Sequence, residues 1–314
     1  MQAPDETAVR EAEQRIAGHV RRTPTLELAA GEMGSAALVL KLEHLQHTGS
    51  FKPRGAFNTL LGAALPPGGV ICASGGNHGI AVAYAAKALG VPAEVFLPLS
   101  SSPVKVKLLR ALGATVRQIG SVYAEALTAM RERQAATGAL EVHAYDQPAT
   151  VAGQGTLFLE WLEQAPDMTT LLVAVGGGGL MGGALAALGD RVKLVAVEPR
   201  HAPTLAEALD AGEPVDVEVS GIAGDSLGAR RIGNIGFELV RRFGLMNCTV
   251  GDDEIRAAQH WLWAHARIVS EPGGATALAA LLSGAYKPVP DERVGVLICG
   301  GNADLQSLAI QPPT

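Results

Sequence analysis

Residues 171–188 have the sequence LLVAVGGGGLMGGALAAL, and this segment decides the fold class. Its first five residues are all apolar, as in a strand that is buried on both faces of a sheet. The next four are Gly176, Gly177, Gly178 and Gly179. Because glycines have no side chains, they let the backbone approach an anion and direct successive N–H groups at it. We therefore expect a strand, an anion-binding turn and the start of a helix.

Apolar, β-rich runs and Ala-rich helical runs alternate in the same way along most of the chain. Strands that are apolar throughout and separated by helices argue for parallel sheets covered on both faces, so we predict an α/β fold. Region 212–234 has scattered glycines and no clean periodicity, which predicts a loop that borders a site. The expected strands are 37–42, 70–73, 93–97, 115–119, 171–175, 193–197 and 294–298, and the expected helices are 79–88, 102–112, 123–137, 153–164 and 252–266.

The composition excludes several classes of function. The chain has 314 residues, of which 48% are hydrophobic, enough for one large domain or two modest ones. A net charge of −6 gives no electrostatic basis for binding nucleic acid or an anionic membrane, and no stretch reaches membrane-spanning length. The cysteines, Cys72, Cys248 and Cys299, are not clustered, which supports neither a disulfide framework nor a zinc site. We expect a cytoplasmic protein.

Residues 47–56, HTGSFKPRGA, place a lysine shortly after a predicted strand. A lone lysine in a turn is usually a solvated surface residue. Lys52, however, follows Ser50 and Phe51, and small residues that suit close packing come after it. A lysine half-buried beside apolar groups loses proton affinity and becomes an amine that can form a Schiff base.

Three other polar segments lie beside predicted strands or helices. Residues 74–79, SGGNHG, precede an Ala-rich helix, where N–H groups, a hydroxyl and an amide form a carboxylate pocket; the alternative is a helix N-cap in a tight turn. Residues 299–304, CGGNAD, follow a strand, at the edge where open α/β sheets bind ligands. The alternative for Cys299 is an ordinary buried cysteine. Glu271 is expected near the same edge, and its alternative role is an acidic N-cap.

The glycine-rich turn also allows another class of function. The sequence lacks the Gly-Lys-Ser/Thr of a P-loop, but Gly177, Gly179 and Gly182 satisfy the pattern G-x-G-x-x-G, and Glu198 ends the next predicted strand. This pattern is typical of dinucleotide binding, so a nicotinamide-dependent oxidoreductase is an alternative, although it leaves Lys52 unexplained. A non-catalytic small-molecule binding protein is a further alternative, in which the lysine is incidental.

Taken together and in this order, the segments resemble the fold-type II pyridoxal-phosphate enzymes, in the branch of the serine/threonine dehydratases and serine racemase. The resemblance covers about Thr23 to Asp304 and rests on SFKxRGA, SxGNHG, AGQGT (152–156), the four glycines and CGGN. It implies the tryptophan synthase β-like fold, in which two α/β domains with parallel sheets hold the cofactor between them. The large cofactor-binding domain is expected to comprise 1–67 and 144–314, and the small domain 68–143.

The resemblance also implies the reaction and the role of each matching residue. Lys52 would hold pyridoxal phosphate as a Schiff base and, once the substrate amine displaces it, take the Cα proton. The implied enzyme is a homodimeric ammonia-lyase (dehydratase) that converts a β-hydroxy L-amino acid such as serine or threonine to a 2-oxo acid and ammonia. The other positions carried over are Phe51 against the cofactor ring, Asn77 at its phenolic oxygen, Gly176, Gly177, Gly178 and Gly179 at its phosphate, Cys299 at its pyridine nitrogen with Glu271 close by, and Ser74, Gly75, Asn77 and His78 at the substrate carboxylate.

Two positions depart from the family pattern. Gly75 stands where serine racemase has a serine that serves as acid/base on the opposite face, so dehydration is favoured over the alternative of an amino-acid racemase. The family's site for Mg²⁺ or Ca²⁺ uses two carboxylates and a carbonyl. Glu198 and Ala202 match this site, but Thr204 replaces the second carboxylate, which leaves a poor site for a hard cation. Which β-hydroxy amino acid is preferred stays open.

Overall fold

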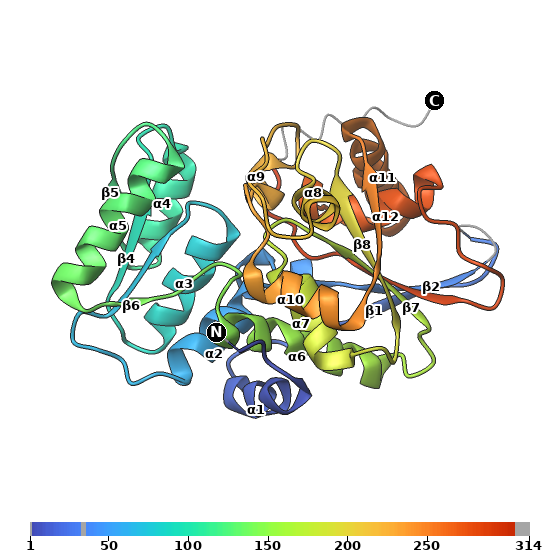
Figure 1. Cartoon of the computed structure of the whole chain (residues 1–314), viewed down its shortest axis with the longest axis horizontal. Helices are drawn as coiled ribbons and strands as arrows, with labels where there is room; N and C mark the ends of the chain where they lie inside the picture. Colours follow the sequence, from blue (N-terminus) through green and yellow to red (C-terminus); the bar gives the residue numbers. More distant parts are fainter. Residues whose placement is uncertain (1, 33–35, 305–314) are drawn as a thin grey trace.

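The computed structural model describes residues 2–32 and 36–304, which form two β-sheets (Figure 1). The six-stranded sheet has the order β1 (Thr25–Leu28), β2 (Ala37–Lys41), β10 (Arg293–Leu297), β7 (Thr170–Ala174), β8 (Lys193–Pro199) and β9 (Met246–Val250). The four-stranded sheet has the order β5 (Thr115–Gln118), β4 (Ala93–Leu97), β3 (Val70–Ala73) and β6 (Leu140–Glu141).

Every strand pair is parallel among the described residues except β1 with β2. The α/β fold with parallel sheets is therefore confirmed. The antiparallel strand β1 was not expected from the sequence. It lies at the edge of the sheet, and the stretch that joins it to β2 is too short for the crossover that parallel neighbours need.

The helices cover both sheets, and in Figure 1 the four-stranded sheet lies on the left with its own three helices. The chain enters this left half after α2 and returns from it to α6, so the four-stranded sheet is an insertion between two elements of the other half. The bounds are α1 (Glu6–Ile16), η1 (Glu43–Leu45), η2 (His47–Gly49), α2 (Lys52–Leu61), α3 (Asn77–Ala88), α4 (Pro103–Ala111), α5 (Tyr123–Thr137), α6 (Pro148–Gln164), α7 (Gly179–Leu188), α8 (Thr204–Ala211), α9 (Gly224–Leu227), α10 (Asn234–Phe243), α11 (Asp252–Ala266) and α12 (Pro272–Ser283).

Helix α7, which the glycine run opens, is buried along its whole length. It packs against α6, and small residues allow the two backbones to come close. A Cβ added at Gly183 would lie 2.7 Å from the amide nitrogen of Gly155. Side chains at these two positions would push α6 and α7 apart, so Gly155 and Gly183 are needed for this contact.

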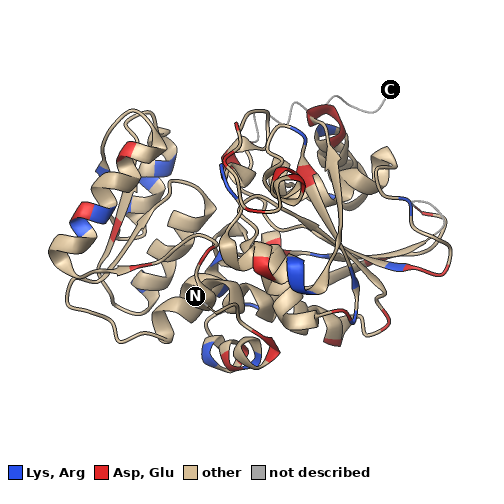
Figure 2. Ribbon diagram, viewed as in Figure 1, with Lys and Arg blue, Asp and Glu red and all other residues tan. Residues whose placement is uncertain are grey.

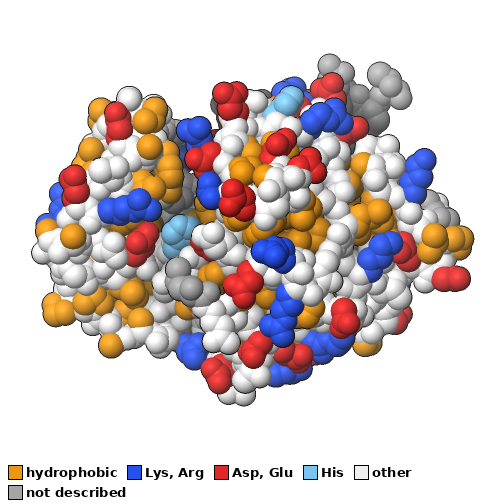
Figure 3. All heavy atoms as spheres, viewed as in Figure 1, with side chains coloured by type: hydrophobic (Ala, Val, Ile, Leu, Met, Phe, Trp, Pro, Cys, Tyr) orange, Lys and Arg blue, Asp and Glu red, His pale blue; other side chains and the backbone are white. Residues whose placement is uncertain are grey.

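The molecular surface mixes charge with local apolar areas. Figure 2 shows residues of both signs close together on α1 and α5. Figure 3 shows hydrophobic side chains on the upper part of the four-stranded half. Leu99, Ile119 and Tyr123 are exposed large hydrophobic residues of the inserted segment. No described helix has the length and hydropathy needed to cross a membrane.

Candidate active site

The predicted site residues come together at the carboxyl ends of neighbouring strands. Lys52 follows β2, Cys299 follows β10 and the glycine run follows β7, and these three strands are adjacent in the six-stranded sheet. Ser74 follows β3 of the other sheet. Open α/β sheets bind their ligands at this edge, so the strand order explains why distant motifs meet.

Lys52 lies at the start of α2 with its amine in a largely apolar environment. Its Nζ donates to the carbonyl oxygen of Ala144 over 2.8 Å and lies 5.0 Å from the centroid of the Phe51 ring. Burial lowers the pKa of Lys52 to about 8, against the smaller opposing effects of Cys299 and Glu271. The side chain therefore has the lowered proton affinity that was expected from the sequence.

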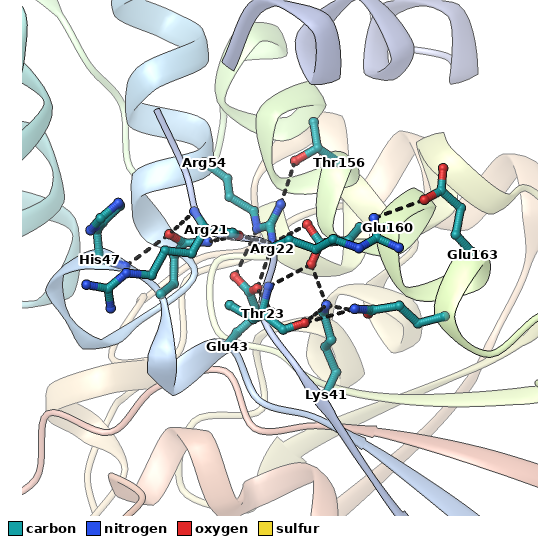
Figure 4. A network of polar contacts seen from close by, with 12 residues as sticks. Arg21, Arg22, Thr23, Lys41, Glu43, His47, Arg54, Thr156, Glu160 and Glu163 are labelled. Carbon is teal, nitrogen blue, oxygen red and sulfur yellow. Dashed lines mark hydrogen bonds and ion pairs between the residues drawn. The ribbon is translucent and has the colours of Figure 1, made fainter. Parts of the chain in front are cut away.

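The first turn of α2 is anchored by a buried network of charged side chains (Figure 4). Arg54 donates to both carboxylate oxygens of Glu43, over 2.9 and 2.7 Å, and to Glu160 over 2.9 Å. Lys41 donates to the other oxygen of Glu160 and to the carbonyl of Thr23. Two cations thus balance two carboxylates directly behind the lysine-bearing turn. Arg54 belongs to the motif SFKxRGA, but no sequence pattern indicated a role for it.

The glycine run leaves its amide groups free for a ligand. Among the hydrogen bonds of the described residues, none uses the N–H of Gly177, Gly178 or Gly179 as a donor. Side chains are excluded here, because a Cβ at Gly177 would overlap the ring of Tyr145 and Gly178 has a φ of 81°. Free amides at the N-terminus of α7 fit a phosphate. No sequence pattern indicated Tyr145, because its contact with the glycine turn depends on the fold.

Asn77, Glu271 and Asn302 form a hydrogen-bonded chain across the two halves of the molecule. The Asn77 amide nitrogen donates to Glu271 Oε1 over 2.6 Å. The Asn302 amide nitrogen donates to Asn77 Oδ1 and to the carbonyl of Thr48, each over 2.8 Å. Burial raises the pKa of Glu271 to about 7. Asn302 belongs to the quoted CGGN motif, but the sequence alone did not indicate its partners.

The segment 74–78 supplies a helix N-terminus and a small loop. The N-cap of α3 is Gly76, which provides no side-chain cap, and its N–H donates to the Ser74 hydroxyl over 3.3 Å. The His78 ring is buried and its Nε2 lies 2.7 Å from the carbonyl oxygen of Val142. Burial lowers the pKa of His78 to about 3, so the ring is neutral. Its backbone amide, rather than its ring, is the group at the N-terminus of α3.

Cys299 is buried, and its thiol donates to the carbonyl of Gly273 over 3.5 Å. Burial raises the pKa of this thiol, with a smaller contribution from Glu271, so it is neutral. A neutral thiol can contact a pyridine nitrogen but cannot balance the charge of a protonated ring.

The residues expected to hold a cation are already bonded to other groups of the protein. Glu198 Oε1 accepts from the amide of Leu205 over 2.7 Å, and Oε2 accepts from the amide of Ala206 over 2.9 Å and from Asn247 over 3.0 Å. The carbonyl of Ala202 accepts from the amide of Thr204 over 3.0 Å. Within the described ranges, no three His, Cys, Asp or Glu residues form a group that could hold a metal ion. One carboxylate beside a threonine is a donor set that does not fit Mg²⁺ or Ca²⁺.

Comparisons with known proteins agree with this geometry. Phenylserine dehydratase from Ralstonia pickettii is 38% identical over 98% of this chain and 95% of its own length. L-Threonine ammonia-lyase from Thermotoga maritima is 35% identical over 96% of this chain and 76% of its own length. The structure of maize serine racemase has a TM-score of 0.92 at 32% identity, and the match covers 98% of this chain and 96% of that one.

The profile of pyridoxal-phosphate dependent enzymes matches residues 16–300. The match includes the buried lysine, the free amides of the glycine turn and the neutral thiol, which fit the amine-reactive, anionic and pyridine parts of that cofactor. Neither an oxidoreductase nor a non-catalytic binding protein explains why these three features occur together. The chain therefore belongs to the family of pyridoxal-phosphate dependent enzymes, with the fold-type II architecture.

Proposed function

We propose that this enzyme is an ammonia-lyase that converts a β-hydroxy L-amino acid to a 2-oxo acid and ammonia. The observation that carries the proposal is an asymmetry between two positions of the site. Lys52 provides a buried amine, whereas Gly75, where the racemase pattern has a serine, provides no side chain. Elimination needs a base at Cα and an acid beside the leaving hydroxyl, which the cofactor phosphate would supply. Racemisation instead needs a proton donor on the opposite face of Cα. Similarity to enzymes named phenylserine dehydratase and L-threonine ammonia-lyase supports the same choice.

The site residues supply the contacts that pyridoxal phosphate needs. We assign the phosphate to the amides of Gly176–Gly179, the pyridine nitrogen to Cys299 and the covalent attachment to Lys52. Asn77 would bind the phenolic oxygen, and Phe51 would lie against the ring. When bound, the cofactor delocalises the negative charge that proton removal leaves at Cα. A thiol rather than a carboxylate at the ring nitrogen makes it a weaker electron sink, which suits elimination over transamination.

Lys52 is the proposed general base at Cα. Its pKa of about 8 lies near neutral pH, where a base is most effective. To reach the substrate, the Lys52 amine leaves its hydrogen bond to the Ala144 carbonyl and moves to the Cα proton. The substrate carboxylate is assigned to the Ser74 hydroxyl and to the free amides of Gly75, Asn77 and His78 at the start of α3, where the helix dipole favours an anion.

Chiral analysis of L-serine, L-threonine and phenylserine turnover tests the proposal. We expect 2-oxo acid with little D-isomer. Gly75→Ser should raise the ratio of inversion to elimination, and Gly75→Ala is the matched control, because both variants place a Cβ 3.0 Å from the Leu97 side chain and only the first adds a hydroxyl. If the unaltered enzyme forms inverted product as fast as oxo acid, the lyase proposal is wrong and the cofactor assignment stands.

Substrate size is the next question for this assay. The 38% identity to an enzyme named phenylserine dehydratase supports acceptance of a bulky β-substituent. We therefore expect turnover of phenylserine as well as of threonine. An enzyme that turns over serine and rejects phenylserine would contradict this extension.

We also propose the assembly and the compartment. Residues 68–143 would form a small domain and 1–67 with 144–314 a large one, which is supported by the placement of all four strands of the smaller sheet within the first range. The three cysteines are free, as suits a reducing cytoplasm. A homodimer follows from the family resemblance, and sedimentation velocity on the purified protein distinguishes it from a monomer.

A further inference from the structure

Thr204 connects α8 to the glycine turn that is assigned to the phosphate. Its side chain is fully buried, and its hydroxyl lies 2.5 Å from the carbonyl oxygen of Gly176 and 3.2 Å from Glu198 Oε1. A threonine hydroxyl has one hydrogen to donate, and the shorter contact takes it. The first residue of the turn is therefore held by a side chain that stands where the family pattern has a carboxylate.

Glu198 receives its compensation from backbone and amide donors rather than from a cation. The amides of Leu205 and Ala206 belong to the first turn of α8 and point at the two carboxylate oxygens. Asn247 on β9 adds a third donor. The N-terminus of a helix carries a partial positive charge, which stabilises an anion placed in this way. Three N–H donors thus compensate the buried carboxylate where the family pattern has a cation.

The carbonyl that the family pattern would use as a further ligand takes part in a local backbone hydrogen bond. The Ala202 carbonyl accepts the Thr204 amide, so its oxygen is part of the turn that starts α8. Mg²⁺ and Ca²⁺ need six or more oxygen ligands, and a single carboxylate surrounded by N–H donors cannot begin such a set.

We propose that hydrogen bonds replace, in this protein, the divalent cation of the family pattern. Thr204 is then a positioning residue for the phosphate-binding turn. The enzyme folds and binds its cofactor without Mg²⁺ or Ca²⁺. This inference concerns cofactor binding and stability. It is independent of which amino acid is the substrate, so its tests can fail while the lyase proposal stands, and the reverse.

Metal depletion of the holoenzyme is the first test. The protein is dialysed against EDTA, and the melting temperature and the absorbance of bound pyridoxal phosphate are measured with and without added Mg²⁺ or Ca²⁺. We expect neither quantity to change. A fall in melting temperature or loss of cofactor on chelation, restored by either cation, would overturn the proposal.

Thr204→Val tests the positioning role by cofactor titration of the apoprotein. The change keeps the shape but leaves the buried Gly176 carbonyl without its donor, and we expect roughly tenfold weaker binding of pyridoxal phosphate. Thr204→Ser should bind like the unaltered protein. Thr59→Val is the matched control, since it removes another buried hydroxyl, one that donates to Gly55 within α2. It should lower the melting temperature and leave cofactor affinity unchanged. Equal affinity in the Thr204→Val and unaltered proteins would refute the positioning role.

Thr204→Asp restores the second carboxylate of the family pattern and tests whether residue 204 excludes the cation. In EDTA the new carboxylate faces Glu198 and the Gly176 carbonyl, so we expect a melting temperature below that of the unaltered protein. Added Ca²⁺ should recover it in this variant alone. If Ca²⁺ does not raise the melting temperature of this variant, residue 204 is not what excludes the cation.

Discussion

Replacing Arg54 by methionine should destabilise the protein strongly, although the residue contacts no substrate. The Arg54 side chain is 2% exposed, and its two carboxylate partners, Glu43 and Glu160, are 0% and 9% exposed. Methionine fills much of the same space but donates no hydrogen bond. Glu160 keeps Lys41 as a partner, whereas Glu43 keeps only the Thr23 hydroxyl. The variant therefore contains one buried carboxylate without a compensating cation.

The magnitude follows from the count of charges. Removing one partner of a buried ion pair costs about 3–5 kcal/mol, mainly because the other charge stays buried and unpaired. For a chain of this size that corresponds to a fall in melting temperature of roughly 5–8 °C. The effect should shrink only as pH falls below 4.5. Although burial raises it, Arg54 and Lys41 hold the pKa of Glu160 below its usual value, and this contribution to stability is lost as pH falls through the folded-state pKa.

The assay is thermal unfolding followed by circular dichroism for Arg54→Met and for the double variant Arg54→Met/Glu43→Gln. Neutralising Glu43 leaves Lys41 and Glu160 as a balanced pair, so the double variant should recover most of the lost stability. If it melts no higher than the single variant, lost packing rather than charge imbalance causes the effect, and the reasoning is refuted.

Two further predictions concern pH. The pKa of Lys52 is about 8 in the folded state and 10.5 in the unfolded state. Between these pH values the unfolded chain binds more protons, so the free energy of unfolding of the apoprotein rises by up to about 3 kcal/mol as pH increases from 8 to 10.5. Lys52→Met should lack that gain in urea titrations from pH 7.5 to about 10.5, and an equal gain in the variant would contradict it. Glu271 has a raised pKa of about 7, so stability falls as pH rises from 4.5 to 7. Glu271→Gln keeps the acceptor for Asn77 and should flatten this fall in melting temperature; an unchanged slope would assign it to other groups.

Much of the fold could be predicted because its buried strands and long helices have strong local patterns. Val70–Ala73 and Ala93–Leu97 are buried strands, and Tyr123–Thr137 and Asp252–Ala266 are long helices, and all four have the bounds expected from the sequence. Thr25–Leu28 was missed because its four residues are too few for their alternation of polar and apolar side chains to stand out. The short helix α9 lies in the region expected to be a loop, where its four residues are too few to show a period.

The site was predictable where one segment carries the chemistry and not where two segments meet. Lys52 and the glycine turn were identified because residues next to each other in the sequence indicate a buried amine in one case and an anion-binding backbone in the other. Asn302 and Tyr145 were missed because their partners lie far away in sequence. The weakness of the cation site followed from Thr204, but the donors that replace the cation come from the first turn of α8 and from β9, which only the fold brings to Glu198.

The division of the chain between two sheets also determines what spectroscopy can detect. All three tryptophans, Trp161, Trp261 and Trp263, lie on α6 and α11, in the half of the molecule that contains the six-stranded sheet. The inserted segment with the four-stranded sheet has none. Intrinsic tryptophan emission is therefore a reporter of one half alone, and an opening of the inserted half would pass without a signal. A tryptophan placed on α5, for example at Tyr123, would make that motion visible.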